Sequence, residues 1–358
     1  MSESTSTDGH RSFDTLRWTY VAACAAIGAW SVLAWLLAPG WADGRRTLGI
    51  AVAALLGVGL ASARPRPRWV AGAVALIVWT VIAWGYVRWI ADDAHAEMTG
   101  PFAGPNPFGA LAAVAAVTAL VLACTSRPWP LRTGAAVAAV VAGQALVRSG
   151  SMGALIALGC GAVVTVVATW PRRGVAGRRG AGVVVVAAVA TGALALGLGV
   201  SALASSGTRH VAGTGLGVDP ENHAAEHFEI WGDAVAVWRA HPVVGVGPGA
   251  LPHVKRGLED ARDDVLHALA ETGLVAALAW LLASACAGMA VGVVALRGSG
   301  RSSPATVALA AAAAVLVVYS VVDTTAAWPV VAAVFFSVAG STVAAASRRP
   351  DPDLDVGT

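Results

Sequence analysis

The chain has 358 residues, of which 57% are hydrophobic and only 13% are charged, and its mean hydropathy is +0.69. A soluble domain of this length would carry about twice that charged fraction, so the composition excludes an ordinary globular enzyme. The net charge is only +3, and we find no nucleotide-binding loop, dinucleotide fingerprint or nucleic-acid-binding patch. We therefore expect an all-α, polytopic integral membrane protein with no nucleic-acid partner.

Apolar runs long enough to cross a bilayer recur along the whole chain, since about 20 apolar residues span it as a helix. The sequence predicts ten spans, at 17–38, 47–63, 69–90, 108–125, 132–147, 150–170, 181–203, 266–294, 304–323 and 326–346. The first run is too long for a signal-peptide core, so we expect it to be retained as a helix. The abundant small residues favour closely packed helices.

These spans divide the chain into five parts. The predicted parts are a cytoplasmic tail (1–16), seven spans (17–203), an extracytoplasmic segment (204–265), three spans (266–346) and a second cytoplasmic tail (347–358). The orientation follows from arginine, because cytoplasmic loops of membrane proteins are enriched in basic residues. Fifteen arginines then fall on the inner side. The short outer loops carry only Arg45, Arg46 and Arg148, with Arg88 at a helix end. We expect a multi-pass protein of the inner (cytoplasmic) membrane with both termini cytoplasmic.

The extracytoplasmic segment 204–265 contains signals for two helices. Asp219 and Pro220 form a good helix start, with a capping carboxylate followed by proline at the first helical position. Apolar residues then recur at helical spacing, at Phe228, Trp231, Val235 and Trp238. This pattern predicts an amphipathic helix on the outer membrane face that ends before Pro242. The run GVGPG (245–249) is typical of a turn, and a second helix should begin around Ala261 and continue into the eighth span.

Two stretches resemble the O-antigen ligase and polymerase family of membrane glycosyltransferases: EIWGDAVAVWRAHPVVGVGPGAL and the following DDVLHALAETGLVAALAWLL. TGPFAGPNPFGAL is similar to another family loop, with Asn106 at its asparagine position, and YSVVDTTAAWPVVAAVFFSVAG is similar to the closing helices, with Asp323 in the outer turn. The resemblance covers roughly residues 97–345. It implies a GT-C-like bundle that transfers a glycan from an undecaprenyl-pyrophosphate carrier to a hydroxyl of an acceptor glycan or lipid. The transfer would occur on the outer face, with inversion and without metal or other cofactor.

The chain departs from the family pattern at its key basic positions. Counting back from Glu271, the family's functional histidine is Arg262 here, and the asparagine that follows it is Asp263. Counting back from Trp231, the family's arginine is His227. The two basic residue types therefore stand exchanged between positions 227 and 262. This exchange would keep both chemical groups in the site. A guanidinium could hold pyrophosphate oxygens, and an imidazole could orient or deprotonate the acceptor.

The predicted catalytic residues are therefore His227 and Arg262. In the turn near residue 150 the family often has Ser-Arg-Gly, whereas this chain reads Ser151-Met152-Gly153, and Arg148 lies one helical turn earlier. The resemblance then suggests further residues for the donor phosphates or the substrate, namely Arg148, Asp263, His267, Asn106 and Asp323.

Each candidate also has a purely structural interpretation. His227 is also consistent with a histidine at the membrane interface, and Arg262 with a solvated helix start. Asp263 and Asp264 suit the first turn of any helix. The remaining alternatives are a packed polar pair for His267 and Glu271, interfacial snorkelling for Arg148, a short turn at Asp323, and a helix cap or turn at Asn106.

The sequence also has features of two other functional classes. His223, Glu226 and His227 formally match the HxxEH zinc motif, with Glu259 as a further carboxylate, but a match of five residues arises easily by chance. The second class is non-catalytic: a degenerate family member or a glycan-lipid transporter. Charged residues inside the membrane would favour a transporter, whereas most charges in this chain lie at helix ends.

Overall fold

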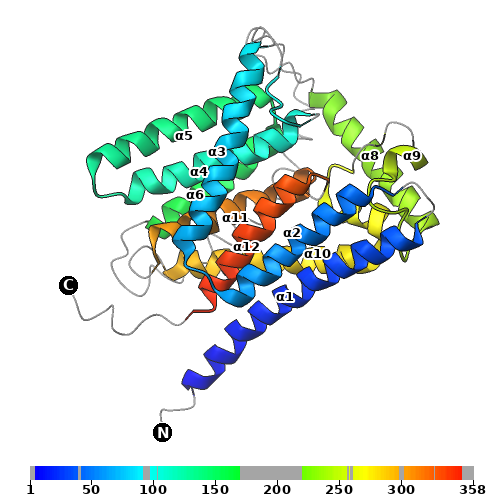
Figure 1. Cartoon of the computed structure of the whole chain (residues 1–358), viewed down its shortest axis with the longest axis horizontal. Helices are drawn as coiled ribbons and strands as arrows, with labels where there is room; N and C mark the ends of the chain where they lie inside the picture. The colour runs from blue at the N-terminus through cyan, green and yellow to red at the C-terminus, as the bar shows by residue number, and fades with distance from the viewer. Residues whose placement is uncertain are drawn as a thin grey trace.

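The computed structural model describes residues 5–38, 42–91, 97–102, 104–169, 220–255, 258, 261–297, 302–325 and 327–348, and the side chains of 5–12 and 220–227 are not described. Its regular elements within these ranges are helices (Figure 1). They are α1 (Thr5–Leu37), α2 (Gly44–Ala63), α3 (Pro67–Ala91), α4 (Pro105–Thr125), α5 (Trp129–Ser149), α6 (Met152–Thr169), α8 (Pro220–Ala240), α9 (Leu251–Val254), α10 (Asp264–Arg297), α11 (Pro304–Val322) and α12 (Pro329–Ala346).

Within the described ranges, nine helices are long and apolar enough to cross a membrane: α1 from Phe13 onward, α2 to α6, and α10 to α12. The prediction of a polytopic, all-helical membrane protein is confirmed. These helices coincide with nine of the ten predicted spans, with ends that differ by a few residues. The remaining predicted span, 181–203, lies outside the described residues.

Proline and small residues explain where the helices begin and how closely they pack. The helices α3, α4, α11 and α12 each begin at a proline, which fits the first turn because its missing N–H would have no partner there. A Cβ on Gly49 of α2 would lie 2.7 Å from the Pro329 ring of α12, and one on Gly340 would lie 2.8 Å from the Gly57 carbonyl oxygen. Glycine therefore lets α2 and α12 approach with little space between them.

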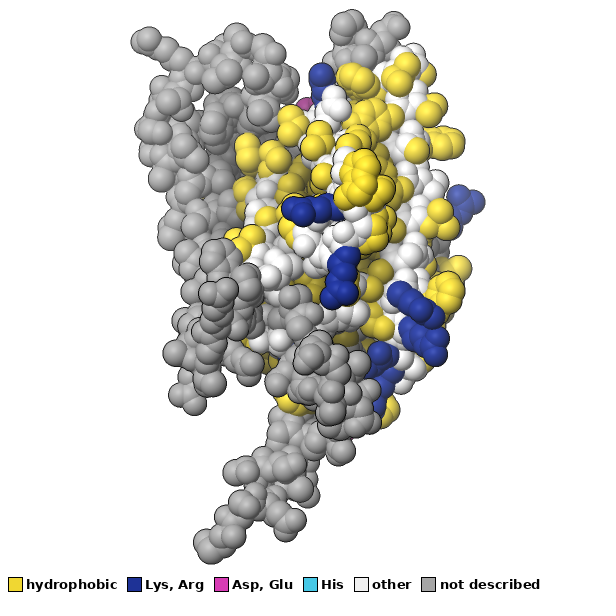
Figure 2. Space-filling view, turned by 90° about the vertical axis from the view of Figure 1, so that its left-hand side faces the viewer, with side chains coloured by type: hydrophobic (Ala, Val, Ile, Leu, Met, Phe, Trp, Pro, Cys, Tyr) yellow, Lys and Arg dark blue, Asp and Glu magenta, His cyan; other side chains and the backbone are white. Residues whose placement is uncertain are grey.

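The most deeply buried helices are α4, α11 and α12, and aromatic rings fill the space between α10 and α12. Phe335 and Phe336 of α12 are fully buried. Trp280 of α10 stacks on Phe335 with ring centroids 5.5 Å apart and meets Phe336 edge-on at 5.2 Å. By contrast, many large apolar side chains of α1, α2, α3 and α5 are exposed. Figure 2 shows one outer face on which hydrophobic side chains are widespread and basic side chains occur from the upper to the lower part. This is the surface expected of a helix bundle in lipid.

The interhelical loops gather at two ends of the bundle. At one end, which we call the α8 end, Asp43 N donates to the Pro248 carbonyl (2.7 Å), Met98 N donates to the Arg148 carbonyl (3.1 Å) and Thr325 N donates to Asp264 (2.7 Å). The described parts of the loops predicted to lie outside are thus joined to one another at this end. The start of α1 and the end of α12 lie away from α8 and α9 (Figure 1).

The other end, which we call the basic end, is held together by arginines. Arg64 pairs with Asp14 at 3.0 Å, Arg348 donates to the Pro65 carbonyl at 2.8 Å, and Arg297 donates to the Ala345 carbonyl at 2.9 Å. Burial and the neighbouring Arg64 lower the pKa of the Arg348 guanidinium.

Helix α8 runs from Pro220 to Ala240, as predicted, and the face that packs on the protein is not the apolar stripe that was predicted to lie on the membrane. Its apolar residues Ile230, Ala234 and Val237 belong to a buried cluster with described residues of the following loop and of α10, such as Val246, Leu251 and Ala270. Phe228 is 61% exposed and touches Trp231 edge-on, with centroids 5.6 Å apart. Ala234 and Val237 are buried on the packed face, whereas Phe228 lies outside it.

Candidate functional site

The site is organised by a break in α10. Gly273, the tenth residue of the 34-residue α10, has non-helical angles (φ 77°, ψ −172°). The loop that carries GVGPG lies against this break. Val246 N donates to the Ala270 carbonyl (3.0 Å), Gly247 N donates to the Glu271 carbonyl (2.8 Å), and Leu274 N donates to the Pro242 carbonyl (3.2 Å). Backbone groups released by the break are thereby satisfied inside the protein, as the low-dielectric environment requires.

Glycine is required on both sides of this contact. A Cβ on Gly273 would overlap the Val243 carbonyl oxygen, and a Cβ on Gly245 (φ 65°) would lie 2.5 Å from the Glu271 carbonyl oxygen. The conformation of Gly273 is one that residues with a side chain essentially never adopt. The GVGPG turn and the segment Glu271-Thr272-Gly273 thus form the two sides of a single backbone contact.

We expect Gly273→Ala to destabilise the protein strongly. The backbone conformation alone should cost about 1–3 kcal/mol, and the clash with Val243 adds to it. The matched control is Gly288→Ala in the same helix, where an added Cβ meets nothing within 4 Å. That change should raise stability by up to about 1 kcal/mol, because alanine is the better helix former. Thermal unfolding in detergent, followed by tryptophan fluorescence, measures both. Equal melting temperatures for the two variants would contradict the importance of the break.

A buried cluster of three charged or ionisable residues lies beside the break. Arg46, in the first turn of α2, places Nη2 2.9 Å from His267 Nε2 and Nη1 3.5 Å from Glu271 Oε1. His267 Nε2 lies 3.1 Å from Glu271 Oε2, one helical turn away. Only 2% of His267 and of Glu271 is exposed. The guanidinium supplies a permanent positive charge that balances the buried carboxylate.

The packed-pair interpretation of His267 and Glu271 thus fits the structure, with Arg46 as a third member. A cavity of about 20 Å³ beside them, lined also by Trp280, has room for a single water molecule but not for a sugar. His267 thus contacts Arg46 and Glu271 in the protein interior. Its contact with the substrate stays a prediction.

The acidic pair at the start of α10 is engaged in structural contacts. Asp263 Oδ1 accepts from Leu266 N at 2.8 Å and so caps the helix. Burial raises the pKa of the Asp263 carboxyl, while the amides of Leu266 and Val265 and nearby His267 act in the opposite direction. Asp264 is fully buried and accepts from both the backbone N–H and the hydroxyl of Thr325. These contacts join α10 to the turn between α11 and α12.

That turn contains Asp323, which is buried and accepts from Thr324 N at 2.7 Å. It also reaches the loop before α4, because Phe102 meets Trp328 edge-on at 5.7 Å. Asn106 lies inside the first turn of α4, where Gly104 occupies the cap position, so the interpretation of Asn106 as the helix cap is wrong. Asn106 is half-buried at this position, and its contact with a glycan stays a prediction.

Arg148 lies at the α8 end but packs toward α3. Its side chain is exposed, and the guanidinium lies 5.0 Å from the centre of the Trp89 ring. A cation over an indole face is an attractive contact, and indoles are enriched at membrane interfaces.

Arg262 lies at the α8 end as well, immediately before the cap of α10. It is half-buried and has a left-handed backbone, with φ 48°.

The side chain of His227 lies outside the described residues, although its backbone belongs to α8. The proposed pairing of His227 with Arg262 therefore stays a prediction. The same holds for the HxxEH interpretation, because the side chains of His223, Glu226 and Glu259 are not described either. Among the residues whose side chains are described, no group of three His, Cys, Asp or Glu has metal-binding geometry.

Arg46 is the site residue that the sequence argument missed. The sequence does contain a sign of its importance. Arg46 is one of the few arginines in a predicted outer loop, whereas basic residues usually lie in cytoplasmic loops. A buried carboxylate is what holds it there, and this partner lies more than 200 residues away along the chain.

Comparison with known proteins bears on the same region. Residues 137–281 match the model of a family described as O-antigen ligase. This confirms the resemblance over that part, which contains α8, the GVGPG loop and the broken first half of α10. The Arg46 and Asp323 regions lie outside the match. No curated protein matches the chain significantly.

Proposed function

We propose, from the match of residues 137–281 to the O-antigen ligase family, that this protein is a polysaccharide ligase or polymerase of the cell envelope. It transfers a glycan from an undecaprenyl-pyrophosphate-linked donor to a hydroxyl of an acceptor glycan or lipid. One observation supports this proposal most. The region that matches the family contains α8, the GVGPG loop and the start of α10, and these parts meet at one end of a membrane bundle.

In this reaction the acceptor oxygen bonds to the anomeric carbon as the bond from that carbon to the pyrophosphate oxygen breaks. The configuration inverts, and undecaprenyl pyrophosphate leaves with additional negative charge. Arg262 would stabilise that charge, because a guanidinium forms paired hydrogen bonds with phosphate oxygens. His227 would orient the acceptor hydroxyl and accept its proton.

The backbone of Arg262 supports a functional role. A left-handed conformation costs roughly 1–2 kcal/mol for a residue with a side chain, and glycine would avoid this cost. Strained residues of this kind cluster at functional sites. Arg262 also precedes a helix start that is fixed by Asp263 and Asp264, so its guanidinium extends from a rigid support.

We further propose that the α8 end faces outward from the cytoplasmic membrane and that the basic end faces the cytoplasm. Arg64, Arg66, Arg68 and Arg297 supply positive charge at the basic end, as expected for the cytoplasmic side. The donor head group and the acceptor would then be reached from outside.

Deletion in the native host tests the function. Surface glycan should be lost or shortened, and lipid-linked precursors should accumulate. Precursors with a single repeat unit would identify a polymerase, and precursors with complete chains would identify a ligase. The wild-type chain should restore the glycan, whereas Arg262→Gly should not. Unchanged glycan and precursors after deletion would contradict the proposal. Lost surface glycan together with a purified protein that transfers from no lipid-linked donor would instead favour a glycan-lipid transporter.

A further inference from the structure

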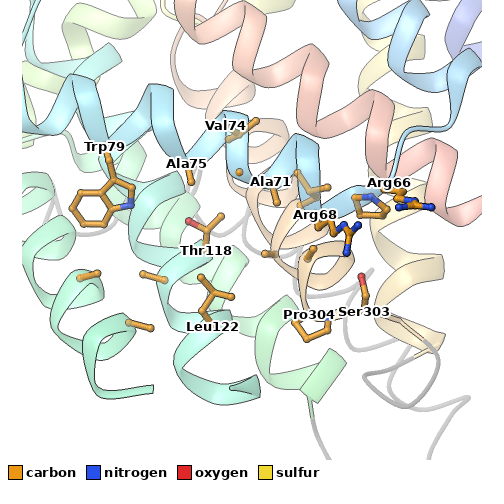
Figure 3. Close-up of a pocket in the computed structure, with 18 residues that line it drawn as sticks. Arg66, Arg68, Ala71, Val74, Ala75, Trp79, Thr118, Leu122, Ser303 and Pro304 are labelled. Atoms are coloured by element: carbon orange, nitrogen blue, oxygen red, sulfur yellow. The ribbon is translucent and has the colours of Figure 1, made fainter. Parts of the chain in front are cut away.

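The described part of the chain contains a large groove at the basic end, far from the candidate site. Its volume is about 730 Å³, and it lies between α3, α4, α5 and α11. In Figure 3, Arg66, Arg68 and Ser303 lie at one end of the groove and Trp79 lies at the other. The remaining lining is mostly alanine, valine, leucine and proline.

The length of the groove matches one leaflet of a bilayer. Along α3 it is lined by Arg68, Ala71, Gly72, Ala75 and Trp79, which recur at helical spacing on one face. Trp79 lies eleven positions after Arg68 in the helix, which is about 16 Å at 1.5 Å per residue. Half of the hydrocarbon core is about 15 Å thick. The groove therefore extends from the interface to roughly the membrane midplane.

Charge is confined to the mouth of the groove and has one sign. Arg66 and Arg68 are exposed there, and the described lining residues include no carboxylate. Helices α3 and α11 also begin at the mouth, with Pro67 and Pro304 among the lining residues. The positive end of the helix dipole at a helix start favours a negatively charged ligand. The groove thus combines an anion-binding mouth with an apolar interior.

We propose that this groove binds one anionic phospholipid. The phosphate contacts Arg66 and Arg68, and an acyl chain lies along α3 as far as Trp79. Such a ligand satisfies both the positive mouth and the apolar interior, whereas a soluble anion would leave the interior empty. The site is independent of glycan transfer, because it lies at the end of the bundle opposite α8.

Binding is measured by native mass spectrometry of the purified full chain in detergent with added phosphatidylglycerol or phosphatidylcholine. We expect one phosphatidylglycerol to be retained in preference to phosphatidylcholine. Arg66→Ala combined with Arg68→Ala should weaken phosphatidylglycerol binding at least about tenfold, since charge-assisted contacts to phosphate are lost. The control is Arg127→Ala combined with Arg132→Ala, which removes two charges outside the groove lining. Equal retention of both lipids, or equal effects of the two double variants, would overturn the proposal.

A second pair of variants tests the apolar interior. An added Cβ on Gly72 meets nothing within 4 Å, so Gly72→Leu should fill the groove without disturbing the fold and should reduce lipid retention. Gly59→Leu, on α2, is equally unhindered and should leave retention unchanged. A photo-crosslinking residue at position 72 identifies the occupant directly. An adduct with phospholipid supports the proposal, and a crosslink to residues 181–203 of the same chain would overturn it.

Discussion

We expect His227→Ala and Arg262→Ala each to lower the rate of glycan transfer by at least about 100-fold. Loss of His227 removes the group that accepts the acceptor proton, and general base catalysis contributes about 10²–10⁴-fold. Loss of Arg262 removes a positive charge from the pyrophosphate, and such electrostatic stabilisation is often the largest single contribution to catalysis. The measurement is transfer by the purified protein from a lipid-linked donor.

The sharper test is to exchange the two side chains. The double variant His227→Arg with Arg262→His restores the family arrangement and should transfer faster than either single swap. Residues in contact show this kind of non-additivity, and distant residues do not. Two single alanine variants that transfer at the wild-type rate would end the claim that these positions form one functional unit.

Two arginines with a left-handed backbone, Arg262 and Arg64, allow an effect on folding to be distinguished from an effect on glycan transfer. Arg262→Gly removes the guanidinium while relaxing the backbone, so it should fold well and fail to transfer. Arg64, at the end of α2, is the matched control, with φ 50°. Arg64→Gly should also fold and should retain transfer. A drop in transfer of equal size for both variants would point to a general loss of structure.

A second large effect is expected for Arg46. Arg46→Ala leaves the Glu271 carboxylate buried beside His267 without its cation. Removing one partner of a buried ion pair typically destabilises a protein by about 3–5 kcal/mol. The melting temperature in detergent should fall by many degrees. The neighbouring Arg45 is exposed, and Arg45→Ala should change stability by less than about 0.5 kcal/mol.

A double variant distinguishes a lost ion pair from lost packing. Arg46→Met together with Glu271→Leu removes both charges and keeps most of the volume. It should be more stable than Arg46→Ala, because no uncompensated charge stays buried. If the double variant melts below Arg46→Ala, the contribution of Arg46 lies in its packing or hydrogen bonds. Equal melting of Arg45→Ala and Arg46→Ala would show that the buried cluster contributes no stability.

The sequence by itself determined the all-helical membrane architecture and the positions of the nine spanning helices in the described part of the chain. Apolar runs of sufficient length, and prolines at helix starts such as Pro105 and Pro304, act locally and need no partner to be recognised. The amphipathic helix that begins at Pro220 and the GVGPG turn were predicted for the same reason. The resemblance to the ligase family rested on these motifs, and the match of residues 137–281 confirmed it over that region.

The tertiary structure alone decided which polar groups meet. Arg46 and His267 lie 221 residues apart, and Asp264 and Thr325 lie 61 residues apart. No local pattern encodes these pairs, because they depend on which helices become neighbours. In a bundle of alanine- and valine-rich helices the apolar faces differ little, so hydrophobic periodicity does not specify those neighbours. Which face of α8 packs on the protein was decided in the same way, since Ala234 and Val237 cluster with Val246 and Leu251.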